Sequence, residues 1–181
     1  LACARMLVEL NQTMLPEGEL LPAQEEAILK RVDQIQQQEG LMLDELQRKA
    51  VLESVRNSIL ILTGGPGTGK TTTINTIIRY FEGEGLDLYL AAPTGRAAKR
   101  MTEATGYEAR TIHRMLELSG AMPESGKKAS FERNEDNPLE ADVIIVDEMS
   151  MVDIHLFQSL LKAVSPGTRS VSYTHLTLPT T

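Results

Sequence analysis

The stretch GGPGTGKTT, residues 64–72, constrains this chain more than any other feature. Gly64 to Thr71 fits the pattern G-x-x-x-x-G-K-[ST], which is the phosphate-binding P-loop. Glycine lets the backbone bend around a phosphate without a Cβ in the way, so that successive N–H groups point inward and form an anion nest. The helix that follows adds the positive end of its dipole. The stretch therefore predicts a strand, a phosphate-binding loop and a helix, in that order.

The side chains of this loop predict a nucleoside triphosphate and Mg²⁺ as ligands. Lys70 is expected to reach the β- and γ-phosphates as a mobile point charge, and Thr71 is expected to offer its hydroxyl to Mg²⁺. The other predicted nucleotide-binding residues of the loop are Gly65, Pro66, Gly67, Thr68, Gly69 and Thr72. The dinucleotide fingerprint G-x-G-x-x-G does not fit, because Lys-Thr-Thr follows the glycines, and this excludes a Rossmann dehydrogenase.

A second half of the site is predicted in ADVIIVDE, residues 141–148, which reads as a buried strand ending in two acids. Ligands of open α/β sheets bind at the carboxyl ends of strands. We expect Asp147 to orient Mg²⁺ or its waters, and Glu148 to polarise a water for attack on the γ-phosphate. Lys70, Asp147 and Glu148 are thus the predicted catalytic residues. The alternative is a solvated strand end followed by a helix cap.

Hydrophobic periodicity predicts helices alternating with strands along the rest of the chain. The predicted helices are 21–40, 43–57, 69–82, 95–104, 111–118 and 152–164. The predicted strands are 58–62, 87–93 and 141–148, and the polar segment 119–138 is predicted to be a mobile loop. This alternation indicates an α/β fold with a parallel sheet flanked by helices. A chain of 181 residues suffices for one such domain and not for two large ones.

Charge and composition limit the partners and the compartment. The net charge of −7 argues against a dedicated duplex-DNA binder, so any nucleic-acid contact has to use a local patch. The single cysteine, Cys3, cannot form an internal disulfide, and no segment reaches the roughly 18 apolar residues of a membrane span. The N-terminal stretch does not read as a signal peptide. We therefore expect a cytoplasmic protein without a membrane partner.

Gln47 has two interpretations that the residues alone leave open. A glutamine amide donates and accepts at once, so it can read the edge of an adenine. Its position on a predicted helix before the first strand also suits an ordinary exposed surface residue, and chemistry alone favours this second interpretation.

Five segments together resemble superfamily 1 DNA helicases, most closely the RecD-like group (the exodeoxyribonuclease V alpha-subunit family). They are LDELQRKAV, LTGGPGTGKTT, AAPTGRAAKRM, ARTIHRML and VIIVDEMSMVD, and the resemblance covers residues 41–168. It implies a P-loop NTPase fold with a RecA-like sheet, ATP and Mg²⁺ as cofactors, and adenine reading by Gln47. It also implies single-stranded DNA binding by Pro93, Thr94, Gly95, Arg96 and His113, with Lys99, Arg100 and Arg114 nearby.

The function implied by this resemblance is that of the ATP-binding lobe of an ATP-dependent 5′–3′ DNA helicase. Such enzymes couple ATP hydrolysis to translocation on single-stranded DNA and to duplex unwinding, and the parent protein acts alone or with nuclease-complex subunits. Because only the first of two lobes fits in this chain, we expect the fragment to bind nucleotide and to hydrolyse it poorly. The alternatives are a different P-loop ATPase of the AAA+ type and a non-catalytic nucleotide-binding interaction module.

The predicted organisation has three parts. Residues 1–40 form the helical end of an N-terminal region, 41–169 a partial RecA-like lobe, and 170–181 an anomalous tail. The family pattern continues there with an apolar strand and a Gly-Asp…Gln motif, whereas this chain reads SVSYTHLTLPTT, so we interpret the tail as non-native. The alternative is a genuine divergent strand, because valine, tyrosine and threonine favour strands. We expect the fragment either to be marginally stable or to use the tail as a substitute strand.

Overall fold

The computed structural model describes residues 2–12, 21–64, 69–117 and 131–175. Four residues predicted to bind nucleotide, Gly65, Pro66, Gly67 and Thr68, lie outside the described residues. The same holds for most of the predicted loop 119–138.

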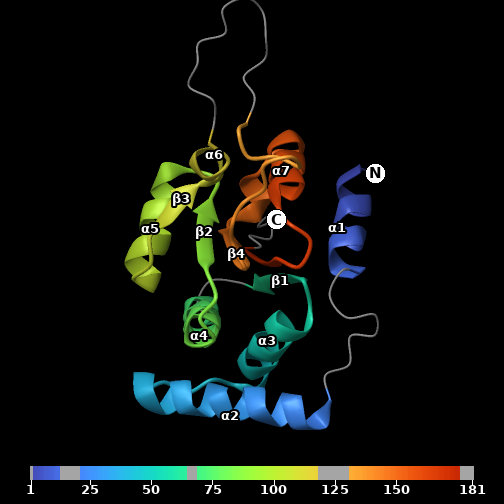
Figure 1. Cartoon of the computed structure of the whole chain (residues 1–181). Coiled ribbons are helices and arrows are strands. Elements are labelled where there is room, and N and C mark those ends of the chain that lie inside the picture. The colour runs from blue at the N-terminus through green and yellow to red at the C-terminus, as the bar shows by residue number, and fades with distance from the viewer. Residues whose placement is uncertain (1, 13–20, 65–68, 118–130, 176–181) are drawn as a thin grey trace, which may run out of the picture.

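Helices and strands alternate along the described chain, as the sequence predicts (Figure 1). The helices are α1 (Ala2–Gln12), α2 (Pro22–Glu39), α3 (Glu45–Arg56), α4 (Lys70–Gly83), α5 (Gly95–Thr105), α6 (Ile112–Met115) and α7 (Ile154–Ala163), with a 3₁₀ turn η1 (Met149–Met151). The strands are β1 (Ile59–Gly64), β2 (Leu88–Ala92), β3 (Ala109–Thr111), β4 (Val143–Asp147) and β5 (Arg169–His175). They form one parallel sheet in the order β1-β5-β4-β2-β3.

The central strand β4 shows how the sheet separates two hydrophobic layers. All five of its residues are buried, and successive side chains point to opposite faces. Val143 and Ile145 pack in one core with residues of α2, α3, α4 and α5. Ile144 and Val146 pack in a second core with residues of α6 and α7. Figure 1 shows α1 alongside α7, with α2, α3 and α4 together on the other side of the sheet.

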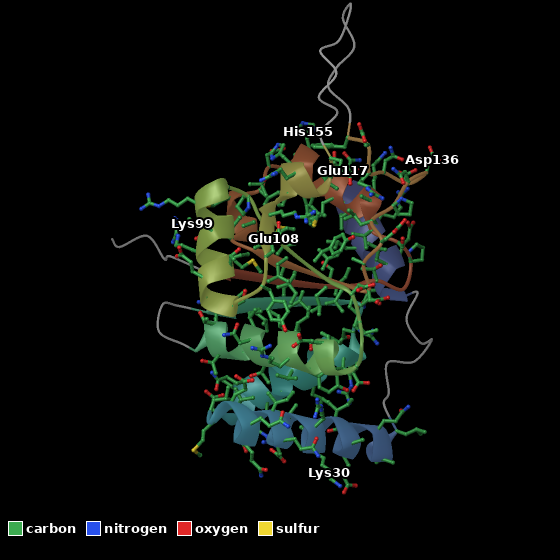
Figure 2. All side chains as sticks on the ribbon, turned by 60° about the vertical axis from the view of Figure 1, so that its left-hand side comes forward. Lys30, Lys99, Glu108, Glu117, Asp136 and His155 are labelled. Carbon is green, nitrogen blue, oxygen red and sulfur yellow. The ribbon has the colours of Figure 1, made fainter. Side chains whose placement is uncertain are left out.

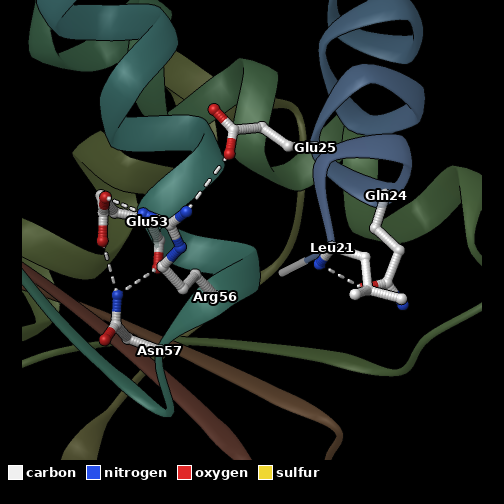
Figure 3. A network of polar contacts seen from close by, with 6 residues as sticks. All are labelled: Leu21, Gln24, Glu25, Glu53, Arg56 and Asn57. Carbon is white, nitrogen blue, oxygen red and sulfur yellow. Dashed lines mark hydrogen bonds and ion pairs between the residues drawn. The ribbon is translucent and has the colours of Figure 1, made fainter. Parts of the chain in front are cut away.

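Helix α2 is joined to the lobe by packing and by a polar network at its N-terminal end (Figure 3). Nη2 of Arg56, the last residue of α3, donates to Oε2 of Glu25 at 3.3 Å, and Nη1 of Arg56 donates to Oε1 of Glu53 at 3.1 Å. Asn57 caps α3 by donating to the backbone oxygen and the carboxylate of Glu53. The network holds α2 against α3, whose other end lies beside the P-loop.

Two regions differ from the predictions, namely the β3 edge of the sheet and the N-terminal helix α1. The segment 111–118 was expected to be helical throughout, and that boundary is wrong: Ala109–Thr111 is the short strand β3, and α6 ends at Met115. β3 exists because it pairs with Leu90–Ala92 of β2 over three residues, a length too short to leave a periodic signal. Helix α1 lies in a stretch for which the sequence predicted no element of its own.

Strand β5 (Arg169–His175) occupies the position between β1 and β4. It pairs in parallel with both of them. The expectation that the tail supplies a strand is therefore confirmed for residues 170–175. The interpretation of residues 170–181 as non-native stays a prediction, as does the division of the chain at residues 40 and 169.

Candidate functional site

The two described ends of the P-loop meet at the carboxyl edge of the sheet. β1 ends at Gly64, and α4 begins at Lys70 after the cap residue Gly69, which has a left-handed φ of 70°. Nζ of Lys70 donates to the carbonyl oxygen of Gly64, so the ammonium group lies over the mouth of the loop. Thr71 is exposed and Thr72 half-buried at the start of the helix. This is the strand–loop–helix context that a P-loop requires.

Gln47 lies against the P-loop and not on an open helix surface. Its Nε2 donates to the carbonyl oxygen of Gly69 at 3.1 Å. The same carbonyl accepts from the backbone N and the side-chain Oγ1 of Thr73, at 3.0 and 3.1 Å. The interpretation of Gln47 as an ordinary surface residue therefore does not describe its environment, although adenine reading itself stays a prediction.

The acid pair lies at the same edge of the sheet as the P-loop. Asp147 of β4 pairs in register with Tyr173 of β5, and Tyr173 pairs with Leu62 of β1. Gly64, where β1 ends, therefore lies only two residues further along the strand direction than Asp147. With neighbouring strands about 4.8 Å apart, β1 and β4 are separated by about 10 Å. Alternation along β4 places Asp147 on the face of Val143 and Ile145, which is the face that α4 covers.

The two acids have different environments. Asp147 is buried, with 8% of its surface exposed, and its Oδ1 accepts from the backbone N of Glu148 at 2.6 Å. A solvated strand end is therefore not what the structure shows for Asp147. Glu148 is half-buried and leaves the strand with a left-handed φ of 50°, a backbone conformation uncommon for a residue other than glycine. The chain turns here into η1, where Met151 N donates to Glu148 O.

A cavity of about 470 Å³ joins the start of α3 to the P-loop. Its lining contains Gln47, Gly64, Lys70 and also three residues that the sequence did not single out, Asp44, Leu46 and Thr73. Asp44 could have been found from the sequence, because D-x-x-Q at the start of a helix is a capping-box pattern. Leu46 is 79% exposed, which leaves an apolar side chain at the cavity rim.

The residues present suit a magnesium–nucleotide complex. Mg²⁺ in nucleotide sites is commonly held by one or two carboxylates together with substrate phosphates and water, so a dense ligand cluster is not required. Within the part of the chain that the structure describes, no group of three or more His, Cys, Asp or Glu residues could hold a metal ion. The assignment of the Asp147 carboxylate and the Thr71 hydroxyl as magnesium ligands stays a prediction.

The predicted DNA-contact residues lie at the ends of β2 and β3. Ala92 of β2 pairs with Thr111 of β3, which brings the loops that follow the two strands side by side. Thr94 caps α5 by accepting from Ala97 N at 3.2 Å, and Thr111 caps α6 by accepting from Arg114 N at 3.2 Å. Gly95 and Arg96 are exposed on α5, and Pro93 is half-buried.

The cations of α5 face solvent beside this edge. Arg96, Lys99 and Arg100 are all exposed, and Lys99 extends away from the body of the protein (Figure 2). Lys99 has a long ion pair with Glu103, with Nζ 3.9 Å from Oε1. His113 is exposed, with its ring centroid 5.9 Å from that of Phe131. These groups are exposed near the carboxyl edge of the sheet, and DNA contact by them stays a prediction.

No helix among the described residues is long and apolar enough to cross a membrane.

A family model described as an AAA domain matches residues 47–173. The ATP-dependent RecD2 DNA helicase of Deinococcus radiodurans is 42% identical over 127 residues, which is 70% of this chain and 17% of the relative. The RecBCD enzyme subunit RecD of Mycolicibacterium smegmatis is 37% identical over 150 residues, covering 70% of this chain and 26% of the relative. The chain thus spans about a sixth to a quarter of the length of these curated relatives.

Solved structures share the fold. A double mutant of the Pif1 helicase from Bacteroides superimposes with a TM-score of 0.53 at 22% identity, over 79% of this chain and 34% of that one. The Bacteroides Pif1 helicase in complex with ADP-AlF3 and single-stranded DNA gives a TM-score of 0.51 at 21% identity, over 75% and 33%. At these identities the likeness shows the fold alone. The parallel sheet flanked by helices, with the P-loop ends at its carboxyl edge, confirms the predicted RecA-like P-loop NTPase fold.

Proposed function

This chain belongs to the AAA domain family and, within it, to the RecD-like superfamily 1 helicases, and we propose that it is the ATP-binding lobe of an ATP-dependent 5′–3′ DNA helicase. The lobe binds ATP with Mg²⁺, and its parent protein couples hydrolysis to movement along single-stranded DNA and to unwinding of the duplex. The observation that carries the proposal is that Lys70, at the start of α4, and Asp147, at the end of β4, lie at the same edge of the sheet, with β5 between their strands.

Each side chain of the site has a proposed role in nucleotide binding or hydrolysis. Lys70 and the N-terminus of α4 attract the phosphates, because a cation and the positive end of a helix dipole act together there. Thr71 and Asp147 hold Mg²⁺, which when bound neutralises charge on the β- and γ-phosphates. Glu148 accepts the proton of the attacking water. Gln47, which lines the same cavity as Lys70, binds the base.

Binding of single-stranded DNA is proposed for the carboxyl edge around Thr94, Gly95 and Arg96, with His113 beside them. Exposed cations and open backbone N–H groups bind phosphates, which position a strand without reading its sequence. Low aromatic content, 4% of the chain, leaves little stacking surface, so the protein binds chiefly the DNA backbone. Replacing Arg96 and Arg100 by alanine in the full-length protein should weaken binding and lower the salt slope by about 0.7 for each phosphate that is no longer neutralised. An unchanged slope contradicts this assignment.

The parent protein's partners follow from the same resemblance. Relatives with the name RecBCD enzyme subunit RecD support a parent protein that is one subunit of a larger enzyme, and the relative with the name ATP-dependent RecD2 DNA helicase supports a DNA helicase. We also propose a cytoplasmic location.

Equilibrium binding of a fluorescent ATP analogue in the presence of Mg²⁺ tests the proposal directly. Lys70→Ala removes a charge-assisted hydrogen bond of about 1.5–3 kcal/mol, so its affinity should fall by a factor of about 10 to 150. Lys30→Ala is the matched control, since Lys30 is exposed on α2, away from the P-loop (Figure 2). Equal affinities of the two variants would rule out the P-loop as the binding site. Stimulation of hydrolysis by single-stranded DNA in the full-length protein separates a helicase from an AAA+ machine.

A further inference from the structure

The side-chain amide of Gln47 is held at both of its ends. Its Oε1 accepts from the backbone N of Asp44 at 2.9 Å, and its Nε2 donates to the carbonyl oxygen of Gly69 at 3.1 Å. Asp44 completes the arrangement as the N-cap of α3, because its Oδ1 accepts from the backbone N of Gln47 at 2.9 Å. Two reciprocal bonds at the helix start and one bond to the P-loop therefore fix this side chain.

These hydrogen bonds permit only one orientation of the amide. If the amide were turned over, its oxygen would face the carbonyl oxygen of Gly69, and its NH₂ group would face the N–H of Asp44. Both hydrogen bonds would then be replaced by repulsion between like groups. In the orientation observed, one N–H of Nε2 and one lone pair of Oε1 are not used by these two bonds. The amide therefore has a donor and an acceptor in a fixed order.

A fixed donor–acceptor order distinguishes the two purine bases. The edge of adenine that carries N7 and N6 offers an acceptor beside a donor, whereas the same edge of guanine offers two acceptors, N7 and O6. An amide held in one orientation can bond both adenine groups, and it opposes its oxygen to O6 of guanine. Asp44 and Gln47 line the same cavity as Lys70 and Gly64, so the amide and the phosphate-binding groups face one ligand.

We propose that Asp44 is a positioning residue, which acts through Gln47 to make the site prefer adenine over guanine nucleotides. The inference rests on the proposed function, since it requires a nucleotide in this cavity. Asp44 itself does not touch the base. Its carboxylate holds the first turn of α3, and with it the N–H that orients the Gln47 amide.

The test compares the dissociation constants of fluorescently labelled ADP and GDP for the whole chain and its variants. Asp44→Ala should weaken ADP binding about fivefold, because roughly one hydrogen bond to the base is lost, and it should not weaken GDP binding, because an amide that is free to turn no longer opposes its oxygen to O6 of guanine. Asp44→Asn keeps an oxygen that accepts from Gln47 N, so it should restore the preference for ADP. Gln47→Ala should lower the preference as Asp44→Ala does, and the double variant should lower it no further.

A second N-cap serves as the matched control for helix stability. Asp153 caps α7 by accepting from the backbone N of His155 and Leu156, so Asp153→Ala destabilises a helix without touching Gln47. It should leave the ratio of the two constants unchanged. If Asp44→Ala also leaves this ratio unchanged, the positioning role is wrong while the proposed function stands. If the unaltered chain binds neither nucleotide, the proposed function itself fails, and this inference fails with it.

Discussion

Replacement of Gly69 by alanine should destabilise the protein well beyond the usual effect of such a change. Gly69 has a φ of 70°, and a Cβ built on it would lie 2.2 Å from Nε2 of Gln47. Real Cβ atoms do not approach another heavy atom so closely, so the glutamine side chain must turn away. It then loses its bonds to Gly69 O and to Asp44 N.

The size of the effect follows from three contributions. A left-handed backbone costs a residue with a side chain about 1–2 kcal/mol. The two broken hydrogen bonds cost about 1 kcal/mol each. Alanine also restricts the unfolded chain, which returns about 0.4–1 kcal/mol. The free energy of unfolding should therefore fall by about 2–3.6 kcal/mol, a large part of the roughly 5–15 kcal/mol that a domain has.

Gly106 provides the control that separates the backbone effect from the clash with Gln47. It has a φ of 75°, and a Cβ there would meet nothing within 4 Å. Urea unfolding of Gly106→Ala should therefore show a loss of only about 1 kcal/mol. The double variant of Gly69→Ala with Gln47→Ala should cost less than the sum of the two single variants, because the clash is absent.

The reasoning is refuted if Gly69→Ala and Gly106→Ala unfold at the same urea concentration with the same slope. It is refuted equally if the effects of Gly69→Ala and Gln47→Ala add. Either result would mean that Gln47 does not lie against the P-loop in solution.

Two further predictions concern strand β5 and a helix cap. Deletion of residues 170–181 removes most of β5, which pairs with both β1 and β4, and should therefore abolish cooperative thermal unfolding. Deletion of residues 176–181 alone is the control, because it leaves β5 in place. An unchanged unfolding midpoint for the longer deletion would exclude a structural role of the tail as a strand. The backbone N–H of Leu156 and the other donors and cations around Asp153 lower the pKa of Asp153 below its ordinary value of 3.8. The charge of Asp153 thus stabilises the fold at pH values above 3.8. This contribution is lost as the pH falls through the lower folded-state pKa, so the stability advantage over Asp153→Asn should shrink as the pH falls below 3.8.

The strands and helices next to the P-loop could be predicted because their signals are local. The run Val143–Val146 is apolar throughout and ends in acids, which suits a strand buried on both faces, and all of it is buried. The P-loop pattern fixes a strand before it and a helix after it, and both are present within two residues of the predicted ends. Here the local pattern and the tertiary fold require the same structure.

Features that depend on distant partners could be predicted from the residues only as one of two alternatives. β5 has the polar sequence RSVSYTH. It forms a strand because the backbone N–H and C=O groups of β1 and β4 need hydrogen-bond partners between these two strands. Gln47 reads as a surface residue, because its partner Gly69 lies 22 residues away and is brought to it by the packing of α3 on α4. The capping role of Asp44 is readable from D-x-x-Q, but its consequence for Gln47 needs the fold.

A crystal structure of the protein with a non-hydrolysable ATP analogue and Mg²⁺ tests the central claim most directly. We predict phosphate density at the N-terminus of α4, with Nζ of Lys70 moved from the carbonyl oxygen of Gly64 onto a phosphate oxygen and the metal ion on the side of Asp147. Density for the nucleotide elsewhere on the protein, with Lys70 still bonded to Gly64, would contradict the account.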